Sequence, residues 1–369
     1  MFEDDRRRIR IALATGILAS AWSSPAAAYD DHAASRSING VRFLLPALSD
    51  SAFVMTEFGL RQGVAYESVG NFPLSSAYTT HLHWVALNEQ ATLSLRIAPW
   101  LAVFTEVNGS ASFGLDVPSL AFSTKDGFSY GGRAGLAVRV VKIDHTRTQV
   151  TLRGYGSKSW GRTLDLMNLF GAVSVRAAND LVQKVAQTRD LAQLPLLVRN
   201  ELYALASSNY TNVVLERDSS WSLGYGVYLA QGIVGPLTLQ GSFGFEHTRA
   251  NEVPFDSELA RFVRLGSHDL SLIGDAVLSA DFSSWGLPVG ISAEYAANKT
   301  FRTVAGAHVY VPSTQNIGGG LFYTGRRGLE LGALLFTARN LKPLPGFETA
   351  QMSEKPIGYS GYFVLRALW

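Results

Sequence analysis

The chain contains no cysteine, which excludes a disulfide framework, a cysteine-ligated metal site and thiol redox chemistry. Beyond the first 28 residues, no apolar run reaches the roughly 20 residues that a membrane-spanning helix requires. Charged residues are also scarce, at 17%, and the formal net charge is only +2. No basic surface therefore predicts a nucleic-acid partner.

The N-terminus has the order of a secretory signal. Four arginines within residues 6–10 precede an apolar run from Ile11 to Trp22 and the small residues of 23–28. We predict a cleavable signal peptide over residues 1–28 and a mature start at Tyr29. Removing its four arginines and three acidic residues lowers the net charge from +2 to about +1. A membrane anchor is the alternative, although the apolar run is short for a spanning helix.

After the signal, apolar and polar residues alternate in segments of about ten residues. In the first such segment Val54, Phe58 and Leu60 occupy even positions, whereas Glu57 and Arg61 occupy odd positions. A period of two directs one set of side chains toward lipid and the other toward water. This division explains how a chain that is 47% hydrophobic can lie in a membrane without a spanning helix. The pattern is typical of a transmembrane β-barrel.

The segments number about twelve, and an even number is expected of a bacterial single-chain barrel. Short turns and long external loops should alternate between the strands of such a barrel. The short connections fall near residues 99–100, 145–146, 235–236, 285–286 and 326–327, and the long ones at 68–89, 114–127, 158–220, 249–269, 299–316 and 338–358. The predicted fold class is all-β, a single antiparallel barrel over residues 52–369.

The last strand resembles an assembly signal. Trp369 ends the sequence, and Phe363 and Leu365 lie at alternate positions before it. This arrangement resembles the C-terminal β-signal of Gram-negative outer-membrane β-barrel proteins, with tryptophan in place of the usual phenylalanine. The resemblance implies location in the outer membrane, contact with its lipid and recognition by the barrel-insertion machinery. It identifies no closer family.

Two segments depart from the strand pattern. Residues 29–51 are expected to form a periplasmic N-terminal segment or small hatch, which is similar to the N-terminal plug of fatty-acid transporters. Residues 158–220 are expected to form a helical external loop, because Leu166, Phe170 and Val173 share one helical face. Such a helical segment could plug the pore or pack on other loops, and the sequence leaves both possibilities open.

The alternation assigns twelve charged residues to the lumen, six basic and six acidic. A charge inside a barrel requires water or a partner, so this set indicates either a wet channel or a salt-bridge network. Twelve strands lie between the small filled barrels and the 16-stranded porins, which favours a narrow or plugged pore without strong ion preference. The residues are Glu57, Arg61, Arg96, Glu106, Arg133, Arg139, Arg153, Glu246, Asp275, Glu294, Glu330 and Arg366.

These features predict a passive channel or porin-like diffusion transporter for small solutes. One alternative is a rim enzyme, a lipid hydrolase or protease, and another is a structural barrel without an open pore. No catalytic residue is assigned, because neighbours such as Glu246 and His247 on one strand face opposite sides. Neither a cofactor nor a metal is expected, and the GSKSW segment at 156–160 lacks the phosphate-loop spacing. The histidines considered for a rim site are His81, His83, His247, His268 and His308.

Overall fold

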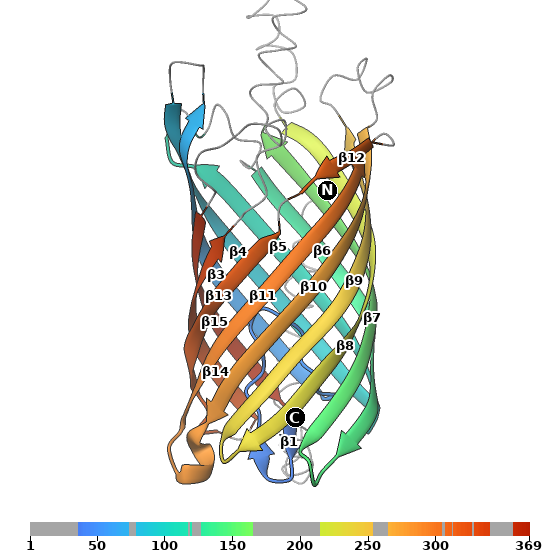
Figure 1. The fold of residues 1–369 in the computed structure, drawn as a ribbon, viewed down its shortest axis with the longest axis vertical. Coiled ribbons are helices and arrows are strands. Elements are labelled where there is room, and N and C mark those ends of the chain that lie inside the picture. Colours follow the sequence, from blue (N-terminus) through green and yellow to red (C-terminus); the bar gives the residue numbers. More distant parts are fainter. Residues whose placement is uncertain are drawn as a thin grey trace, which may run out of the picture.

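Twelve long antiparallel strands close into a barrel in the computed structural model (Figure 1). The structure describes residues 36–73, 79–116, 119, 127–164, 215–253, 265–304, 307–311, 313–326, 328–339 and 357–369. The barrel strands are β3 (Glu57–Pro73), β4 (Thr79–Ala98), β5 (Leu101–Gly114), β6 (Gly127–Ile143), β7 (Thr148–Leu164), β8 (Leu215–Val234), β9 (Leu237–Val253), β10 (Leu265–Asp281), β11 (Val289–Val304), β13 (Thr314–Tyr323), β14 (Leu329–Arg339) and β15 (Ile357–Leu368).

The ring closes where β15 pairs with β3, so that Leu365 lies opposite Leu60. The short strand β12 (Ala307–Tyr310) pairs with the end of β11. Closure leaves the twelve strands without an unpaired edge, which a sheet in lipid requires because no water satisfies its backbone groups. The predicted all-β fold, antiparallel barrel and strand number are therefore confirmed.

The two faces of the wall differ as the alternation requires. Along β5, Val103 and Val107 are exposed on the outer face, whereas Ala102, Phe104 and Glu106 are buried on the inner face. The outer face is apolar, and its Leu335 and Phe363 are each 75% exposed. Large exposed apolar side chains on one face of a closed sheet are the surface that a bilayer covers.

The connections alternate in length as predicted except between β3 and β4, where only residues 74–78 stand in place of the long loop expected at 68–89. At one end of the barrel only residues 99–100, 144–147 and 235–236 link the neighbouring strands. The β10–β11 connection at this end contains the 3-10 helix η4 (Phe282–Trp285), which begins after Asp281. By the usual orientation of such barrels this short-turn end is periplasmic and the opposite, long-loop end is external. None of the described helices is long and apolar enough to cross a membrane.

The strands are longer than the sequence pattern indicated. Residues 79–89, expected in a loop, belong to β4, which has 20 residues, whereas a bilayer requires about 9–11 residues per strand. The bounds predicted for the helical insertion are also wrong, since residues 158–164 extend β7 and residues 215–220 begin β8. The part of this insertion that the structure describes is strand, and residues 165–214 lie outside the described residues.

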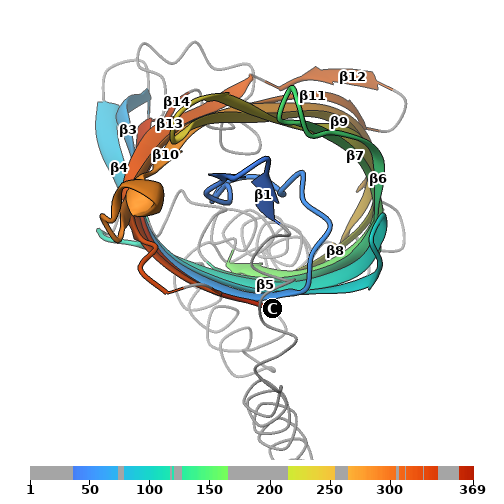
Figure 2. The same ribbon diagram turned by 90° about the horizontal axis from the view of Figure 1, so that it is seen from below.

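The segment of residues 36–56, here called the N-terminal plug, lies inside the ring (Figure 2). It starts with a hairpin of β1 (Ser37–Ile38) and β2 (Val41–Arg42) at the short-turn end (Figure 1). Its apolar side chains then fill the periplasmic half of the lumen, and Phe43 and Phe53 are at most 1% exposed. Residues 1–35, which include the predicted signal peptide, lie outside the described residues.

Two apolar clusters hold the N-terminal plug against the wall. In one, Phe43 and Phe53 pack together at a centroid separation of 5.0 Å. In the other, Leu44 contacts a patch of inward-facing apolar residues on β13, β14 and β15. Val54, expected to face lipid, packs inside against Ala102 and Ala137, because β3 starts only at residue 57. The inward apolar residues of that patch are Phe322, Leu334, Phe336 and Val364.

Candidate functional site: the barrel lumen

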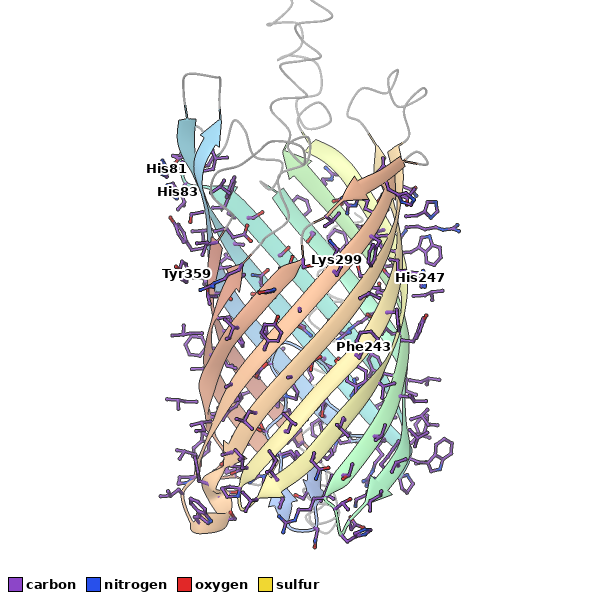
Figure 3. The ribbon with its side chains drawn as sticks, in the orientation of Figure 1. His81, His83, Phe243, His247, Lys299 and Tyr359 are labelled. Atoms are coloured by element: carbon purple, nitrogen blue, oxygen red, sulfur yellow. The ribbon has the colours of Figure 1, made fainter. Side chains whose placement is uncertain are left out.

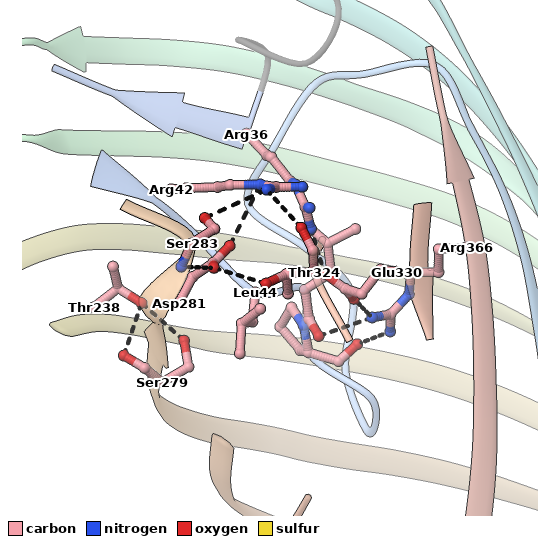
Figure 4. Close-up of polar contacts among 12 residues, drawn as sticks. Arg36, Arg42, Leu44, Thr238, Ser279, Asp281, Ser283, Thr324, Glu330 and Arg366 are labelled. Carbon is pink, nitrogen blue, oxygen red and sulfur yellow. Dashed lines mark hydrogen bonds and ion pairs between the residues drawn. The ribbon is translucent and has the colours of Figure 1, made fainter. Parts of the chain in front are cut away.

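A buried carboxylate joins the N-terminal plug to the last two strands (Figure 4). Glu330 on β14 pairs with Arg36 of the plug and with Arg366 on β15, and the Glu330 side chain is fully buried. Arg366 also donates to the carbonyl oxygens of Leu45, at 2.9 Å, and of Pro46. Arg366 therefore binds the wall carboxylate and the plug backbone together, so that its buried charge and donors are satisfied.

A second ion pair holds the β1–β2 hairpin at the short-turn end (Figure 4). Arg42 lies 3.4 Å from Asp281, the last residue of β10. Arg42 also donates to the Thr324 carbonyl oxygen at 3.2 Å. Asp281 in turn accepts from the Thr324 hydroxyl at 2.9 Å and from the Ser283 N–H at 2.9 Å. The hairpin is thereby attached to the β10–β11 and β13–β14 connections.

The middle of the N-terminal plug is held through its backbone. Glu294 on β11 accepts from the N–H groups of Ala47 and Leu48, each at 3.0 Å from its Oε2 atom. Arg61 on β3 donates to the carbonyl oxygen of Ala47 from the other side of the lumen. A plug residue without secondary structure must find partners for its buried N–H and C=O groups. The wall side chains supply them here.

Asp50 of the N-terminal plug contacts charged and hydroxyl side chains of the wall. Its carboxylate lies 2.7 Å from Arg133 and 3.5 Å from Arg153, and the Tyr228 hydroxyl donates to it at 3.4 Å. Arg133 also pairs with Glu106 at 2.7 Å. Burial by itself raises the pKa of Asp50, but the two arginines outweigh burial and keep this pKa below its ordinary value. Asp50 is therefore held as a carboxylate.

The last residues of the N-terminal plug bind hydroxyl and amide groups of the wall. Gln149 and Thr151 on β7 both donate to the Ala52 carbonyl oxygen, at 2.6 and 2.5 Å. Ser94 on β4 donates to the Met55 carbonyl oxygen at 2.9 Å. These neutral contacts continue around the ring from the ionic ones, so strands on several sides of the barrel contact the plug.

A cavity of about 370 Å³ lies between the N-terminal plug and the β3–β7 side of the wall. Plug residues 45–51 form one side of it, and Glu57, Arg61, Tyr155 and Glu246 are among the residues on the other side. The Oε2 atom of Glu57 accepts no hydrogen bond from any residue that the structure describes. The Tyr155 hydroxyl donates to Glu246 at 2.5 Å. The cavity therefore combines charged groups of both signs with hydroxyl groups.

Toward the long-loop end, pairs of hydroxyl groups replace the ion pairs that surround the N-terminal plug. The upper lumen also carries one bidentate ion pair, in which the Arg302 Nη2 atom lies 2.8 Å from Asp269. Small hydroxyl side chains are hydrophilic without occupying much volume. The hydroxyl pairs are Ser159–Ser220 at 2.6 Å, Ser222–Thr248 at 2.8 Å and Ser271–Thr300 at 2.9 Å.

The structure places all twelve sequence-assigned charged residues at lumen-facing register positions. Six of them bind the N-terminal plug through their side chains: Arg61, Arg133, Arg153, Glu294, Glu330 and Arg366. Glu106 and Glu246 bind other wall residues, and so does Asp275, through Ser242. Glu57 lines the cavity, whereas Arg96 and Arg139 lie near the short-turn end, where the Arg139 N–H donates to Trp100 at 2.8 Å.

The sequence assignment missed the plug's own charges and the charges near the strand ends. Arg36, Arg42 and Asp50 precede the first strand, so no alternation marks them. Asp269 and Arg302 fell within expected loops, although they occupy lumen-facing positions on β10 and β11. Extending the period of two past the apparent end of each strand would have identified this pair.

The five histidines considered for a rim enzyme lie in strands and not in loops. His81, His83 and His247 lie on the outer side of the wall (Figure 3). The Nδ1 atom of His83 lies 2.7 Å from the Tyr66 hydroxyl, and His268 lies opposite Arg249. Glu246 and Asp269 face the lumen, so the wall separates them from the adjacent histidines. Within the described ranges, no three histidine or acidic side chains are grouped to bind a metal.

The residues of the predicted C-terminal assembly signal lie on the outer face and at the short-turn end. Phe363 and Leu365 point outward from β15 and are 75% and 37% exposed. The Trp369 N–H donates to the Thr56 carbonyl oxygen at 3.2 Å, next to the start of β3. This contact joins the last residue of the chain to the end of the N-terminal plug.

No family model matches the chain, and no curated protein matches it by sequence. Solved structures with a similar fold include an outer-membrane channel from Pseudomonas putida F1, at 8% identity and a TM-score of 0.46 over 86% of this chain and 96% of that one. The transport unit of the autotransporter AIDA-I from Escherichia coli matches at 6% identity and 0.45, over 84% and 90%. The Pseudomonas putida toluene transporter TodX matches at 10% and 0.37, over 91% and 97%.

Similarity at this level identifies no function for the present chain. Its own closed ring, apolar outer face and alternating turn lengths are the features of an outer-membrane barrel. The chain is therefore an outer-membrane β-barrel of the Gram-negative type.

Proposed function

We propose that this protein is a passive channel for small polar solutes and that the N-terminal plug is its gate. The proposal rests on one observation: polar side chains line the lumen both around the N-terminal plug and nearer the long-loop end. A barrel that only needed a filled interior would be satisfied by apolar packing, as on β13–β15. Charged and hydroxyl groups elsewhere in the lumen instead favour a hydrated passage.

The way in which the N-terminal plug is attached suits a gate. Its middle section is bound by Glu294 and Arg61 through charge-assisted hydrogen bonds to the plug backbone. Water can replace each such bond when the segment moves, so opening requires no covalent change and leaves the barrel strands paired. The cavity of about 370 Å³ beside residues 45–51 provides space into which this section can move.

The lining also indicates what kind of solute would pass. Four carboxylates and four arginines border the cavity, and Lys158, the fifth basic residue there, occupies an outward register position, so neither sign of charge dominates. Opposite charges arranged around one space accommodate neutral or zwitterionic solutes better than a strongly charged ion. The groups are Asp50, Glu57, Glu106 and Glu246 with Arg61, Arg133, Arg153 and Arg366.

Single-channel recording in planar lipid bilayers tests the proposal. Glu294→Gln removes the charge that binds two plug N–H groups, so we expect openings to become several-fold more frequent than in the wild type. Glu89→Gln is the matched control, since Glu89 faces outward beside Gln62 and contacts no part of the plug in the described structure. The absence of conductance in the wild type and in Glu294→Gln, with both proteins correctly inserted, would eliminate the channel.

A structural barrel without a pore is the second candidate. The burial of Phe43, Phe53 and Met55 at 0–1% exposure favours it, because a well-packed apolar plug resists displacement. The same recordings separate the two candidates. A structural barrel stays closed after Glu294→Gln, whereas a gated channel opens.

A further inference from the structure

The outer surface of β7–β10 near the long-loop end carries a line of cations and rings. Lys158 lies opposite Trp221, which lies opposite Arg249, which in turn lies opposite His268. These four residues, here called the cationic row, occupy outward register positions, and Trp221 is 38% exposed. Adjacent strands are about 4.8 Å apart, so the row extends over roughly 14 Å.

Aromatic rings hold the cations of this row in place. The Nζ atom of Lys158 lies 5.8 Å from the Trp160 ring centroid, and the Cζ atom of Arg249 lies 5.5 Å from the Trp221 ring centroid. Trp160 stacks on Tyr130 at 5.6 Å. A ring attracts a cation without neutralising it. The contacts therefore orient Lys158 and Arg249 while leaving their charge for another partner.

The carboxylates of the same strands lie on the other side of the wall. Every acidic residue of β7–β11 whose side chain is described occupies a lumen-facing register position. The outer face of these strands therefore has positive charge without a described acidic residue, unlike the outer face of β4, which carries Glu89. The lumen-facing acids are Asp218, Glu246, Asp269, Asp275, Asp281 and Glu294.

We propose that the cationic row binds the phosphate groups of a lipid in the external leaflet. Exposed tryptophans on a barrel's outer face mark the membrane–water interface, where lipid headgroups lie. Trp160 and Trp221 place the row at that level. Lys158 and Arg249 are two strand spacings apart, roughly 10 Å, so they can contact two phosphates of one headgroup. Arginine is suited to bidentate phosphate binding, and lysine supplies a point charge.

Native mass spectrometry of the full chain in detergent micelles tests this site. The probes are purified lipid A with both phosphates and the same lipid with its phosphates removed. We expect the wild type to bind the phosphorylated form and Lys158→Gln/Arg249→Gln to bind it at least tenfold more weakly. Arg339→Gln is the matched control, because Arg339 is an exposed, outward-facing cation at the long-loop end of β14. Its affinity should equal that of the wild type.

Two results would overturn the site: wild-type affinity in the double variant, or equal binding of the phosphate-free lipid by the wild type. Heat-modifiable migration on gels verifies the barrel of each variant. If the double variant does not fold, Arg249→Gln and Arg249→Lys are compared with the same probes. Weaker binding by Arg249→Gln alone supports the site, and equal affinities of the two single variants overturn it.

Discussion

The two halves of the lumen solve the problem of a polar interior differently. In the periplasmic half, buried ions such as Glu330 find partners on the N-terminal plug, and apolar side chains fill the space between them. In the external half, hydroxyl groups such as Ser222 and Thr248 pair across neighbouring strands at 2.8 Å. The polar groups of the periplasmic half therefore depend on the N-terminal plug, which is not part of the wall. In the external half, the paired hydroxyl groups both belong to wall strands.

The two halves should therefore differ in how strongly a single substitution lowers the free energy of unfolding. Removing one member of a buried ion pair leaves the other charge buried without a partner, which lowers the free energy of unfolding. The stability of the periplasmic half should therefore be sensitive to single substitutions. A hydrogen bond between two neighbouring hydroxyl groups contributes little net free energy to folding, so the external half should tolerate substitution of such a pair.

The largest effect is expected for Glu330→Ala. This substitution leaves Arg36 and Arg366 without the carboxylate that joins them in a fully buried position. We expect the free energy of unfolding to fall by about 3–5 kcal/mol, measured by urea titration of the protein in lipid vesicles. Glu89→Ala removes an outward carboxylate as the control and should change it by less than about 0.5 kcal/mol. Equal losses in both variants would contradict the contrast.

A smaller effect is expected for Asp50→Asn, which removes the plug carboxylate that pairs with Arg133 and Arg153. Arg133 keeps its pair with Glu106, so we expect a loss of about 1–3 kcal/mol at neutral pH. The pKa of Asp50 is lowered in the folded protein. Its contribution is therefore complete above the ordinary aspartate pKa of about 3.9 and is lost as the pH falls through the lowered value.

The measurement for Asp50 is the difference in unfolding free energy between wild type and Asp50→Asn as a function of pH. We expect this difference to stay constant from neutral pH to about 4 and to shrink below that. A difference that already shrinks between about pH 6 and 5 would show that the Asp50 pKa is not lowered in the folded protein.

The barrel could be predicted from the sequence because its wall obeys a local rule. The alternation around Leu60 and Arg61 fixes which side chains meet lipid and which meet the lumen, and the rule repeats in every strand. Strand lengths were underestimated because residues such as Asp269 lie above the apolar belt, where alternation of polarity weakens. The barrel architecture could therefore be predicted from a pattern that extends over only one or two residues along the chain.

The course of the N-terminal plug could not be predicted in the same way. Its residues lack a period, and its partners are distant in sequence: Arg36 binds a residue 294 positions away, and the Leu44 carbonyl accepts from Gln240, 196 positions away. Nothing within a short window of sequence specifies such contacts. Six of the twelve assigned lumen charges bind this segment, so the alternation predicted the direction of these side chains but not their partner.

The smallest effect is expected from Ser222→Ala/Thr248→Val in the external half. Both members of the hydroxyl pair are removed, so no donor is left without its acceptor. Replacing both partners of a hydrogen bond by apolar groups of similar shape is nearly neutral, and we expect the unfolding free energy to change by less than about 1 kcal/mol in the urea titration. Thr248 also donates to Glu246 at 3.2 Å, so the single variant Ser222→Ala separates this second bond from the pair. A loss as large as that of Glu330→Ala would show that the hydroxyl groups stabilise the wall as strongly as the buried ions do, and the two halves would then not differ in the way proposed.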